Sequence, residues 1–385
     1  MLKHLATLPN LSKGRLHTES ACLYRNSFQR DKDRILHSNA FRRLQYKTQV
    51  FINHEGDHYR NRLTHSLEVA SIARSVAKYL ELSEDLAEAI SLAHDIGHTA
   101  FGHAGERALN KEMEAYGGFS HNLNSFKILV QLEQRYMHFD GLNLTWETID
   151  GLLKHNGPIK KPVDAFIQNY AESFNIPLDD FSSLEAQIAA IADDIAYLSH
   201  DLEDGLRSGL LTFDELEAID EMAHYLVELR KENMQNTTTK LAYELSRKIT
   251  SFFTRDLIDT ILINAKEMNF KSSYDVRNAS CAIALLSNSA FKFLKDLKHL
   301  LFVKIYYNKK LKYTFDKAEY VIKSLFRHYM DNKNLPSQLI NASYKNQKKF
   351  DRVQIIADYI AGMTDRYAIA EFERIYSMNF DDIKI

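Results

Sequence analysis

The chain has 385 residues, of which 45% are apolar and 26% charged, so it can build a large core and is too balanced in charge to be a disordered protein. Its 13 glycines and 5 prolines are few for a protein rich in turns, which argues against an all-β sandwich or barrel. The formal net charge is −2, so any attraction to polyanions must come from a local cluster of charge.

Histidine is the unusual component of this composition. Sixteen histidines stand against two cysteines, Cys22 and Cys281, which favours imidazole chemistry over a disulfide framework or a thiolate metal cage. We expect a protein of a reducing compartment, the cytoplasm. The first twenty residues lack an apolar stretch of signal-peptide length, and no apolar run approaches about 18 residues, so we expect neither export nor membrane spanning.

Most of the chain has the periodicity of amphipathic helices, which predicts an all-α fold. A first helix is predicted over residues 61–80, with an apolar stripe through Leu67 and Tyr79 and His65 near its start. A second is predicted over residues 84–95, because it opens with acids that suit a helix N-terminus and ends just before Gly97.

A third helix is predicted from the Ser-x-x-Glu capping box that begins at Ser182 to about Asp204, ahead of Gly205. Three of the five prolines lie between residues 158 and 177, so residues 156–181 are interpreted as a loop excursion. Helical patterns resume after a polar break at 232–240. We therefore predict an N-terminal segment (1–30), a catalytic helical core (31–210) and a helical C-terminal region (211–385) that packs on the core.

The segment from His94 to His103 brings three imidazoles and the carboxylate of Asp95 into ten residues. Adjacent helical side chains point about 100° apart, so His94 and Asp95 can share an ion only across the end of a helix, where Gly97 breaks the backbone. Two more ligands must come from elsewhere, and His65 and an aspartate of the third helix are the candidates. Such a set suits Mn, Mg, Fe or Co better than a closed zinc site. The alternative is that each histidine is a hydrogen-bonded core residue.

The third predicted helix has one polar face, because Asp193, Tyr197, His200, Asp201 and Asp204 recur at spacings of three and four. Its apolar residues form the opposite face: Ile188, Ile191, Ile195 and Leu198. The polar face is either a solvated surface or the wall of a pocket. A tyrosine and a histidine among the carboxylates favour the pocket.

These residues resemble a known family. A His, a His-Asp pair and a later Asp are the set of the HD-domain metallohydrolases. Six ordered blocks are similar, more narrowly, to the bacterial deoxyguanosine triphosphate triphosphohydrolases: RNSFQRDKDRILHSNAFRRLQYKTQVF, RNRLTHSLEVA, AHDIGHTAFGHAGE, LTWETIDGLLKHNGP, ADDIAYLSHDLEDGLRSG and DYIAGMTDRYA. The resemblance runs from about Arg25 to Ala368, nearly the whole chain.

The resemblance implies one divalent ion, with Mn or Mg foremost and Fe, Co, Ni or Zn as alternatives. Its implied ligands are His65, His94, Asp95 and Asp193. Asp194 is the competitor for the last place, but in the family a tyrosine and an aspartate that touch the sugar follow the ligand at four and eight residues. Tyr197 and Asp201 fit that spacing only when Asp193 is the ligand.

Other matched positions imply contacts with substrate. The family places imidazoles around the triphosphate, and the matching residues here are His98, His103 and His121. Arg62 matches a position that contacts phosphate, and Gln49 matches one that contacts the sugar or base. Glu106, one helical turn after His103, is the implied partner that orients it. Lys154 is either a further phosphate contact or a solvent-exposed lysine, and the exposed lysine is favoured.

Members of this family cleave a deoxynucleoside triphosphate at the α-phosphorus into the deoxynucleoside and tripolyphosphate, and we expect that reaction here. His103 is the expected general acid for the departing O5′. Tyr197 packed against C2′, with Asp201 and Gln49 on the 3′-hydroxyl, would reject ribose by crowding. The resemblance also implies a homo-oligomer, often a hexamer, and in some members a regulatory dNTP.

Two other functions stay open. One is an HD phosphohydrolase acting on a nucleoside monophosphate, a cyclic dinucleotide or an alarmone. The other is a scaffold that senses nucleotides or single-stranded DNA, because lysines between Lys295 and Lys312 alternate with Phe302, Tyr306 and Tyr307. The ordinary explanation of this second pattern is an amphipathic helix with wet lysines and core aromatics.

Overall fold

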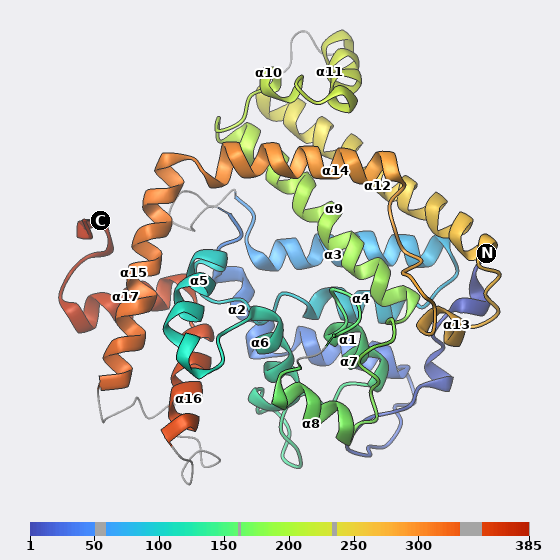
Figure 1. Ribbon diagram of the computed structural model, residues 1–385, viewed down its shortest axis with the longest axis horizontal. Helices are drawn as coiled ribbons and strands as arrows, with labels where there is room; N and C mark the ends of the chain where they lie inside the picture. The colour runs from blue at the N-terminus through green and yellow to red at the C-terminus, as the bar shows by residue number, and fades with distance from the viewer. Residues whose placement is uncertain (51–58, 161–162, 233–236, 332–348, 385) are drawn as a thin grey trace.

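The computed structural model describes residues 1–50, 59–160, 163–232, 237–331 and 349–384, and over these residues it contains helices and no β-strand. The all-α prediction is therefore confirmed. The α-helices, shown in Figure 1, are α1 (Ser27–Leu36), α2 (Asn39–Arg43), α3 (Arg62–Tyr79), α4 (Glu84–Ala93), α5 (Gly102–Met113), α6 (His121–Lys127), α7 (Trp146–Leu153), α8 (Ala165–Ser173), α9 (Leu184–Arg207), α10 (Phe213–Leu216), α11 (Asp220–Glu232), α12 (Thr238–Glu267), α13 (Ser273–Arg277), α14 (Asn288–Leu301), α15 (Lys309–Asp331), α16 (Lys349–Ala361) and α17 (Asp365–Tyr376).

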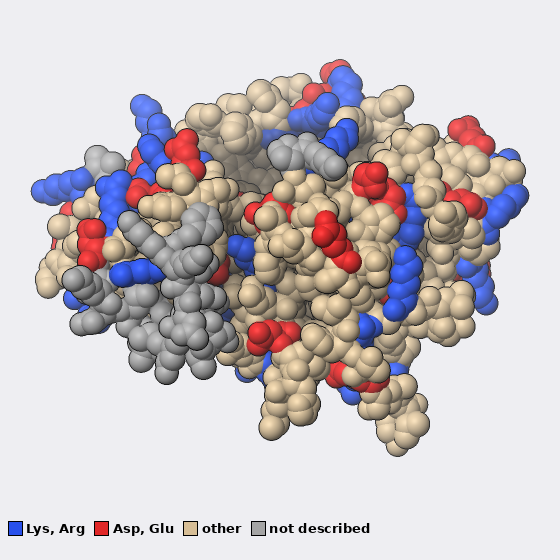
Figure 2. Space-filling model, turned by 60° about the horizontal axis from the view of Figure 1, so that its bottom comes forward, with Lys and Arg blue, Asp and Glu red and all other residues tan. Residues whose placement is uncertain are grey.

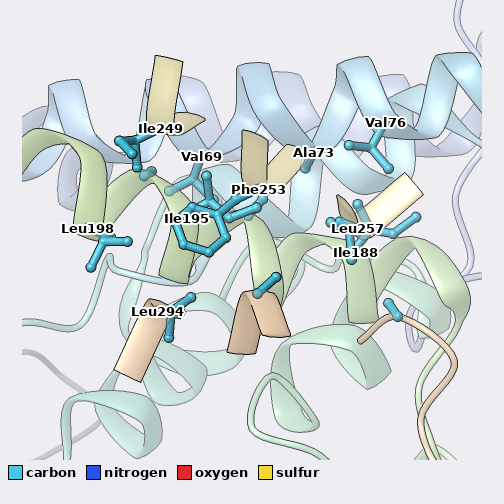
Figure 3. Close-up of a cluster of buried hydrophobic side chains, with 14 of the residues drawn as sticks. Val69, Ala73, Val76, Ile188, Ile195, Leu198, Ile249, Phe253, Leu257 and Leu294 are labelled. Atoms are coloured by element: carbon cyan, nitrogen blue, oxygen red, sulfur yellow. The ribbon is translucent and has the colours of Figure 1, made fainter. Parts of the chain in front are cut away.

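Helix α9 organises the fold. It runs obliquely through the middle of Figure 1 and packs against α3, α4, α12 and α14. The apolar residues that fill these contacts converge in Figure 3: Val69, Ala73 and Val76 from α3, Ile188, Ile195 and Leu198 from α9, Ile249, Phe253 and Leu257 from α12, and Leu294 from α14. One buried cluster thus crosses the boundary predicted near residue 210, so the catalytic core and the following helices share their packing.

Two smaller clusters flank this core. Helices α15 and α16 pack against α5 and α17 packs against α15 at one side of Figure 1, with Ile322, Leu325, Ile356 and Phe372 buried in this cluster. Helices α1, α4, α6 and α7 enclose the third cluster around the only tryptophan, Trp146. The C-terminal helices therefore lie against α5, which carries His103 and Glu106.

Helix α3 begins where the sequence predicts. Asn61 caps it in a reciprocal box, in which its side chain accepts from Thr64 N at 3.0 Å and Thr64 Oγ1 accepts from Asn61 N. The predicted apolar stripe was right for Ala70, Val76 and Leu80, which are buried, and wrong for Leu67 and Tyr79, which are exposed. The buried face consists mainly of small residues that let α4 and α9 approach closely: Val69, Ala70, Ala73, Val76 and Ala77.

Helix α9 differs from its prediction at both ends. Its N-cap is Ser183 and not Ser182, and Glu185 accepts hydrogen bonds from Thr7 instead of closing a capping box. Gly205 does not end the helix, which continues to Arg207. A Cβ at Gly205 would come within 2.7 Å of Ile305 Cδ1, so the side chain of Ile305 packs directly over this glycine.

The excursion predicted over 156–181 is not all loop, because it contains α8. Asp164 caps this helix by accepting from the amides of Phe166 and Ile167. Tyr170 of α8 packs its ring edge against Phe126 of α6. The prolines lie on either side of α8, so interpreting the whole segment as a loop from its proline content missed this short helix. The predicted break at 232–240 falls between α11 and α12, with 233–236 outside the described residues.

The described surface mixes both signs of charge. On the face in Figure 2, lysine and arginine side chains alternate with acidic ones. No described helix combines the length and the apolar character that a membrane span requires.

Candidate metal and substrate site

The structure brings the four implied metal ligands together from three separate segments. His65 lies on the first turn of α3, His94 is the C-cap of α4 with Asp95 following it, and Asp193 lies on α9. Asp193 Oδ1 is 2.9 Å from His65 Nε2 and 3.5 Å from His94 Nε2. The histidines and Asp95 are buried while Asp193 is partly exposed, so the cluster opens on the Asp193 side.

The turn after α4 is held in place by α6. Ser125 Oγ accepts from Gly97 N at 2.9 Å and donates to the carbonyl of His94 at 3.0 Å. Asn124 donates to the carbonyl of Gly97 at 2.7 Å. The helix end predicted from Gly97 is therefore present, and the turn is fastened to the helix that carries His121.

Gly97→Ala is expected to lower both stability and activity. A Cβ at this position would lie 2.1 Å from Ser125 N and 2.4 Å from the carbonyl of His121, so α6 would have to move. Overpacking of this kind costs about 1–3 kcal/mol, which urea unfolding measures. Gly362→Ala is the control, because its Cβ would approach no atom closer than 3.2 Å. Equal stability and equal initial rates for the two variants would contradict this account of Gly97.

The electrostatics of the cluster favour a cation. Neighbouring cationic groups hold the pKa of Asp95 and of Asp193 well below the ordinary value, although burial opposes this. Burial lowers the pKa of His65, whereas Asp193 and Asp95 outweigh burial and raise the pKa of His94 to about 9. Without an ion, the two carboxylates therefore favour a protonated His94. A bound divalent ion would supply that positive charge instead.

The donor set also fits an ion. His94 Nδ1 lies 2.6 Å from the carbonyl of Ser91, so that nitrogen carries a proton and Nε2 is left as the ligand atom. His94 Nε2 is buried and has no hydrogen-bond partner among the described residues. One donor atom each of His65, His94 and Asp95 lies within 4.8 Å of the others. Two nitrogens and two oxygens suit Mn²⁺ or a related ion.

A second group of imidazoles borders the ligands. His98 Nδ1 is 2.8 Å from Asp95 Oδ1, and the rings of His98 and His121 are 3.8 Å apart. Glu106 lies 2.8 Å from His121 Nδ1 but 3.4 Å from His103 Nδ1, so its closer partner is His121. Hydrogen bonds from His103 and His121 hold the pKa of Glu106 far below the ordinary value despite burial. His103 is half exposed, which leaves it free to reach a bound molecule.

Arg62 lies between these two groups. Its Nη1 donates to Asp95 Oδ2 at 2.7 Å, and its Nε is buried without a hydrogen-bond partner. The implied phosphate contact is thus also hydrogen-bonded to an implied metal ligand.

The polar face of α9 lines this site and is not a solvated surface. His200, Asp201 and Asp204 are all buried. Tyr197 OH donates to Tyr306 OH at 2.6 Å, and Tyr306 OH donates to Asp201 Oδ2 at 2.7 Å. Gln49, two residues after Lys47, is buried, and its Oε1 has no hydrogen-bond partner among the described residues.

Three residues that the sequence analysis did not name as site residues lie in or beside this site. Tyr306 enters it from the π-helical turn Phe302–Tyr306, and such turns recur at functional sites. His155 stacks on His94, with its Nε2 3.4 Å from Asp193 Oδ2. His200 contacts His65. The sequence features that could have indicated these residues are the tyrosine among lysines for Tyr306, the histidine of the KHNGP block for His155 and the histidine on the polar face of α9 for His200.

The favoured interpretation of Lys154, a solvent-exposed lysine, was wrong. The side chain is buried and paired with Asp150 at 2.6 Å and with Asp180. It is therefore not a solvent-exposed lysine, and its ammonium group already has two carboxylate partners.

The C-terminal helices fix the loop between His98 and His103. Asp365, at the start of α17, accepts from Thr48 N at 2.9 Å and from Phe101 N at 2.8 Å. The buried Lys47 donates to the carbonyls of His98 and Ala361. These contacts connect the DYIAGMTDRYA block, which lies far along the chain, with the loop between the histidines.

Fold and site together define an HD-domain hydrolase, and comparison with known families agrees. Residues 62–198 match the HD domain, and residues 284–374 match the phosphohydrolase-associated domain. The chain is an enzyme of the phosphohydrolase class.

Similarity to individual proteins is narrower. Three rickettsial proteins, each named deoxyguanosinetriphosphate triphosphohydrolase-like protein, resemble the chain over almost all of both lengths. They come from Rickettsia felis (46% identical over 383 residues, 100% of each chain), Rickettsia prowazekii (45% over 383 residues, 100% of each chain) and Rickettsia rickettsii (46% over 380 residues, 99% of each chain). The chain belongs to this deoxyguanosinetriphosphate triphosphohydrolase-like family, as its motifs predict.

Proposed function

We propose that this nucleotide phosphohydrolase is a metal-dependent deoxynucleoside triphosphate triphosphohydrolase. It cleaves its substrate at the α-phosphorus and releases a deoxynucleoside and tripolyphosphate. The observation that carries the proposal is that His65, His94, Asp95 and Asp193 converge beside a separate group of three imidazoles. The name of the rickettsial relatives supports a substrate with three phosphates.

His65, His94, Asp95 and Asp193 would hold one divalent ion, Mn²⁺ or Mg²⁺ foremost. When bound, such an ion acts as a Lewis acid on a phosphoryl oxygen and makes water more acidic. The protein keeps three of these ligands buried and leaves Asp193 partly exposed, so substrate reaches the centre from that side.

The imidazoles serve the phosphates and the leaving group. His98, His121 and Arg62 bind phosphate oxygens, for which charge-assisted hydrogen bonds are strong. His103 donates a proton to the departing O5′ as the general acid. Glu106 hydrogen-bonds both His103 and His121, so it orients the acid and a phosphate contact together.

The sugar lies against the tyrosines and Asp201. Tyr197 packs on C2′, while Asp201 and Gln49 bond the 3′-hydroxyl, so an added 2′-hydroxyl is crowded out. Tyr306 fixes Asp201 through its hydroxyl and so sets the position of that carboxylate.

Partners and location stay predictions. We predict a homo-oligomer in the cytoplasm, with a regulatory dNTP of the kind that some family members bind. Tyr306, one of the aromatics that motivated the single-stranded DNA hypothesis, is hydrogen-bonded to Asp201 in the proposed site. Lys298 and Lys304 pair with Asp194 and Glu215, whereas Phe302 and Tyr307 are exposed, so the ordinary explanation with core aromatics was wrong for these two.

Product analysis tests the proposal. The purified protein is incubated with Mn²⁺ and each of four dNTPs, singly and mixed, and the products are separated by ion-exchange chromatography. Deoxynucleoside and tripolyphosphate in equal amounts are expected, and EDTA should abolish both. Orthophosphate, pyrophosphate or a linear dinucleotide as the product would contradict the proposed reaction. Activity that appears only in mixtures would identify a regulatory nucleotide.

A further inference from the structure

We infer that His200 is a positioning residue for the metal ligand His65, which it holds in the tautomer and orientation that bind the ion. The inference rests on the metal site of the proposed function. It assigns a role to a buried histidine that neither belongs to the ligand set nor faces the proposed phosphates.

The contact between the two imidazoles is direct. His65 Nδ1 is 2.9 Å from His200 Nε2, and the rings meet edge to face, with centroids 5.0 Å apart and planes at 88°. Both side chains are buried, so water does not compete for the hydrogen bond. The opposite nitrogen of His65, Nε2, faces Asp193. His200 therefore lies behind the ligand, on the side away from the ion.

The direction of this hydrogen bond follows from the groups at its two ends. To bind an ion, His65 must offer the lone pair of Nε2, so its proton resides on Nδ1 and is donated to His200 Nε2. His200 then carries its own proton on Nδ1, which lies 2.8 Å from Asp201 Oδ1, a charge contact without the alignment of a hydrogen bond. The negative charge of Asp201 beside Nδ1 favours a proton on that nitrogen, which leaves His200 Nε2 as the acceptor for His65.

Asp201 is itself held in place. Its other oxygen, Oδ2, accepts from Tyr306 OH, which in turn accepts from Tyr197 OH. The metal ligand His65 is thus connected through His200 to the side chains that surround the proposed sugar. On α9, His200 contacts the proposed metal ligand His65, and the adjacent Asp201 contacts Tyr306.

The far side of His200 borders a groove of about 810 Å³ between α3, α9 and α12. Ser199, Ser246 and Thr250 line the groove beside it. A small molecule in this groove can therefore reach the space that a truncated side chain at position 200 would leave.

Mn²⁺ binding to the full-length protein, measured by titration calorimetry, tests the inference without reference to turnover. His200→Leu fills the space but accepts no hydrogen bond, and its Mn²⁺ dissociation constant is expected to rise about 10- to 100-fold. His200→Gln keeps an acceptor oxygen near the place of Nε2 and is expected to restore most of the affinity. In His200→Ala, imidazole added to the buffer should enter from the groove and tighten Mn²⁺ binding, while the wild type gains nothing.

Ile249→Ala is the matched control, because it removes a fully buried side chain of α12 from the apolar core. It should lower the melting temperature and leave the Mn²⁺ dissociation constant unchanged, which separates loss of packing from loss of the ligand contact. Equal affinity for wild type and His200→Leu would overturn the inference, as would equally weak binding by the Leu and Gln variants together with no effect of imidazole. Failure of the wild type itself to bind Mn²⁺ would overturn the proposed function first.

Discussion

His94→Ala is expected to lower kcat/KM for tripolyphosphate release by at least about 1,000-fold while the protein stays folded. Metal catalysis supplies several kcal/mol of transition-state stabilisation, and each 1.36 kcal/mol changes the rate tenfold. The substitution removes the Nε2 ligand atom, which has no hydrogen-bond partner among the described residues, and one hydrogen bond within the same turn, from Nδ1 to the carbonyl of Ser91. Initial rates at saturating Mn²⁺, together with circular dichroism melting curves, measure both parts of this expectation.

His94 is a better choice for this experiment than Asp95. Removing the Asp95 carboxylate would leave Arg62 and His98 without their buried partner, so activity and stability would fall together. His299→Ala, at an exposed position of α14, is the control and should retain full activity. A His94→Ala protein that turns over as fast as the control would rule out the metal mechanism.

Asp150→Ala is expected to cost about 3–5 kcal/mol of unfolding free energy, because breaking a buried ion pair from one side leaves uncompensated charge. Asp150 is fully buried on α7 and pairs with Lys154 and with Arg277 of α13. The carboxylate therefore joins the segment that precedes His155 to the helices beyond α12. Urea unfolding followed by tryptophan fluorescence measures the cost, since Trp146 stacks near Arg277.

Asp296→Ala is the comparison for this experiment. Asp296 forms an exposed pair with Lys292 at 2.8 Å, and such surface pairs contribute about 0–1 kcal/mol. If the Asp150 variant lost no more stability than the Asp296 variant, the buried cluster would have no structural importance.

The parts of the site that the sequence could predict are those set by local periodicity. Spacings of three and four placed Asp193, Tyr197 and Asp201 on one face of a helix, and all three lie on the same side of α9. Gly97 marked the end of the second helix, and the structure has His94 at that end. Resemblance to a family then connected these segments with His65, which periodicity alone left as a candidate.

The parts that could not be predicted depend on which faces meet. Periodicity shows which residues share a helix face but not what lies opposite, so the apolar stripe of α3 was misplaced toward Leu67. Lys154 looked exposed because its partner Asp180 lies in a distant loop. Tyr306 comes from more than a hundred residues beyond Tyr197, and only the packing of α14 on α9 brings the two hydroxyls together.

The central claim is that four side chains from three segments bind one divalent ion. The most direct test is titration calorimetry with Mn²⁺ on the wild type and on Asp193→Asn. Buffers of different ionisation enthalpy show how many protons are released on binding. One ion per chain is expected for the wild type, with release of protons below about pH 9, because the pKa of His94 without the ion is about 9. Affinity should therefore increase as the pH rises toward that value, and Asp193→Asn should bind far more weakly. Wild-type binding that neither releases protons nor depends on Asp193 would contradict the account.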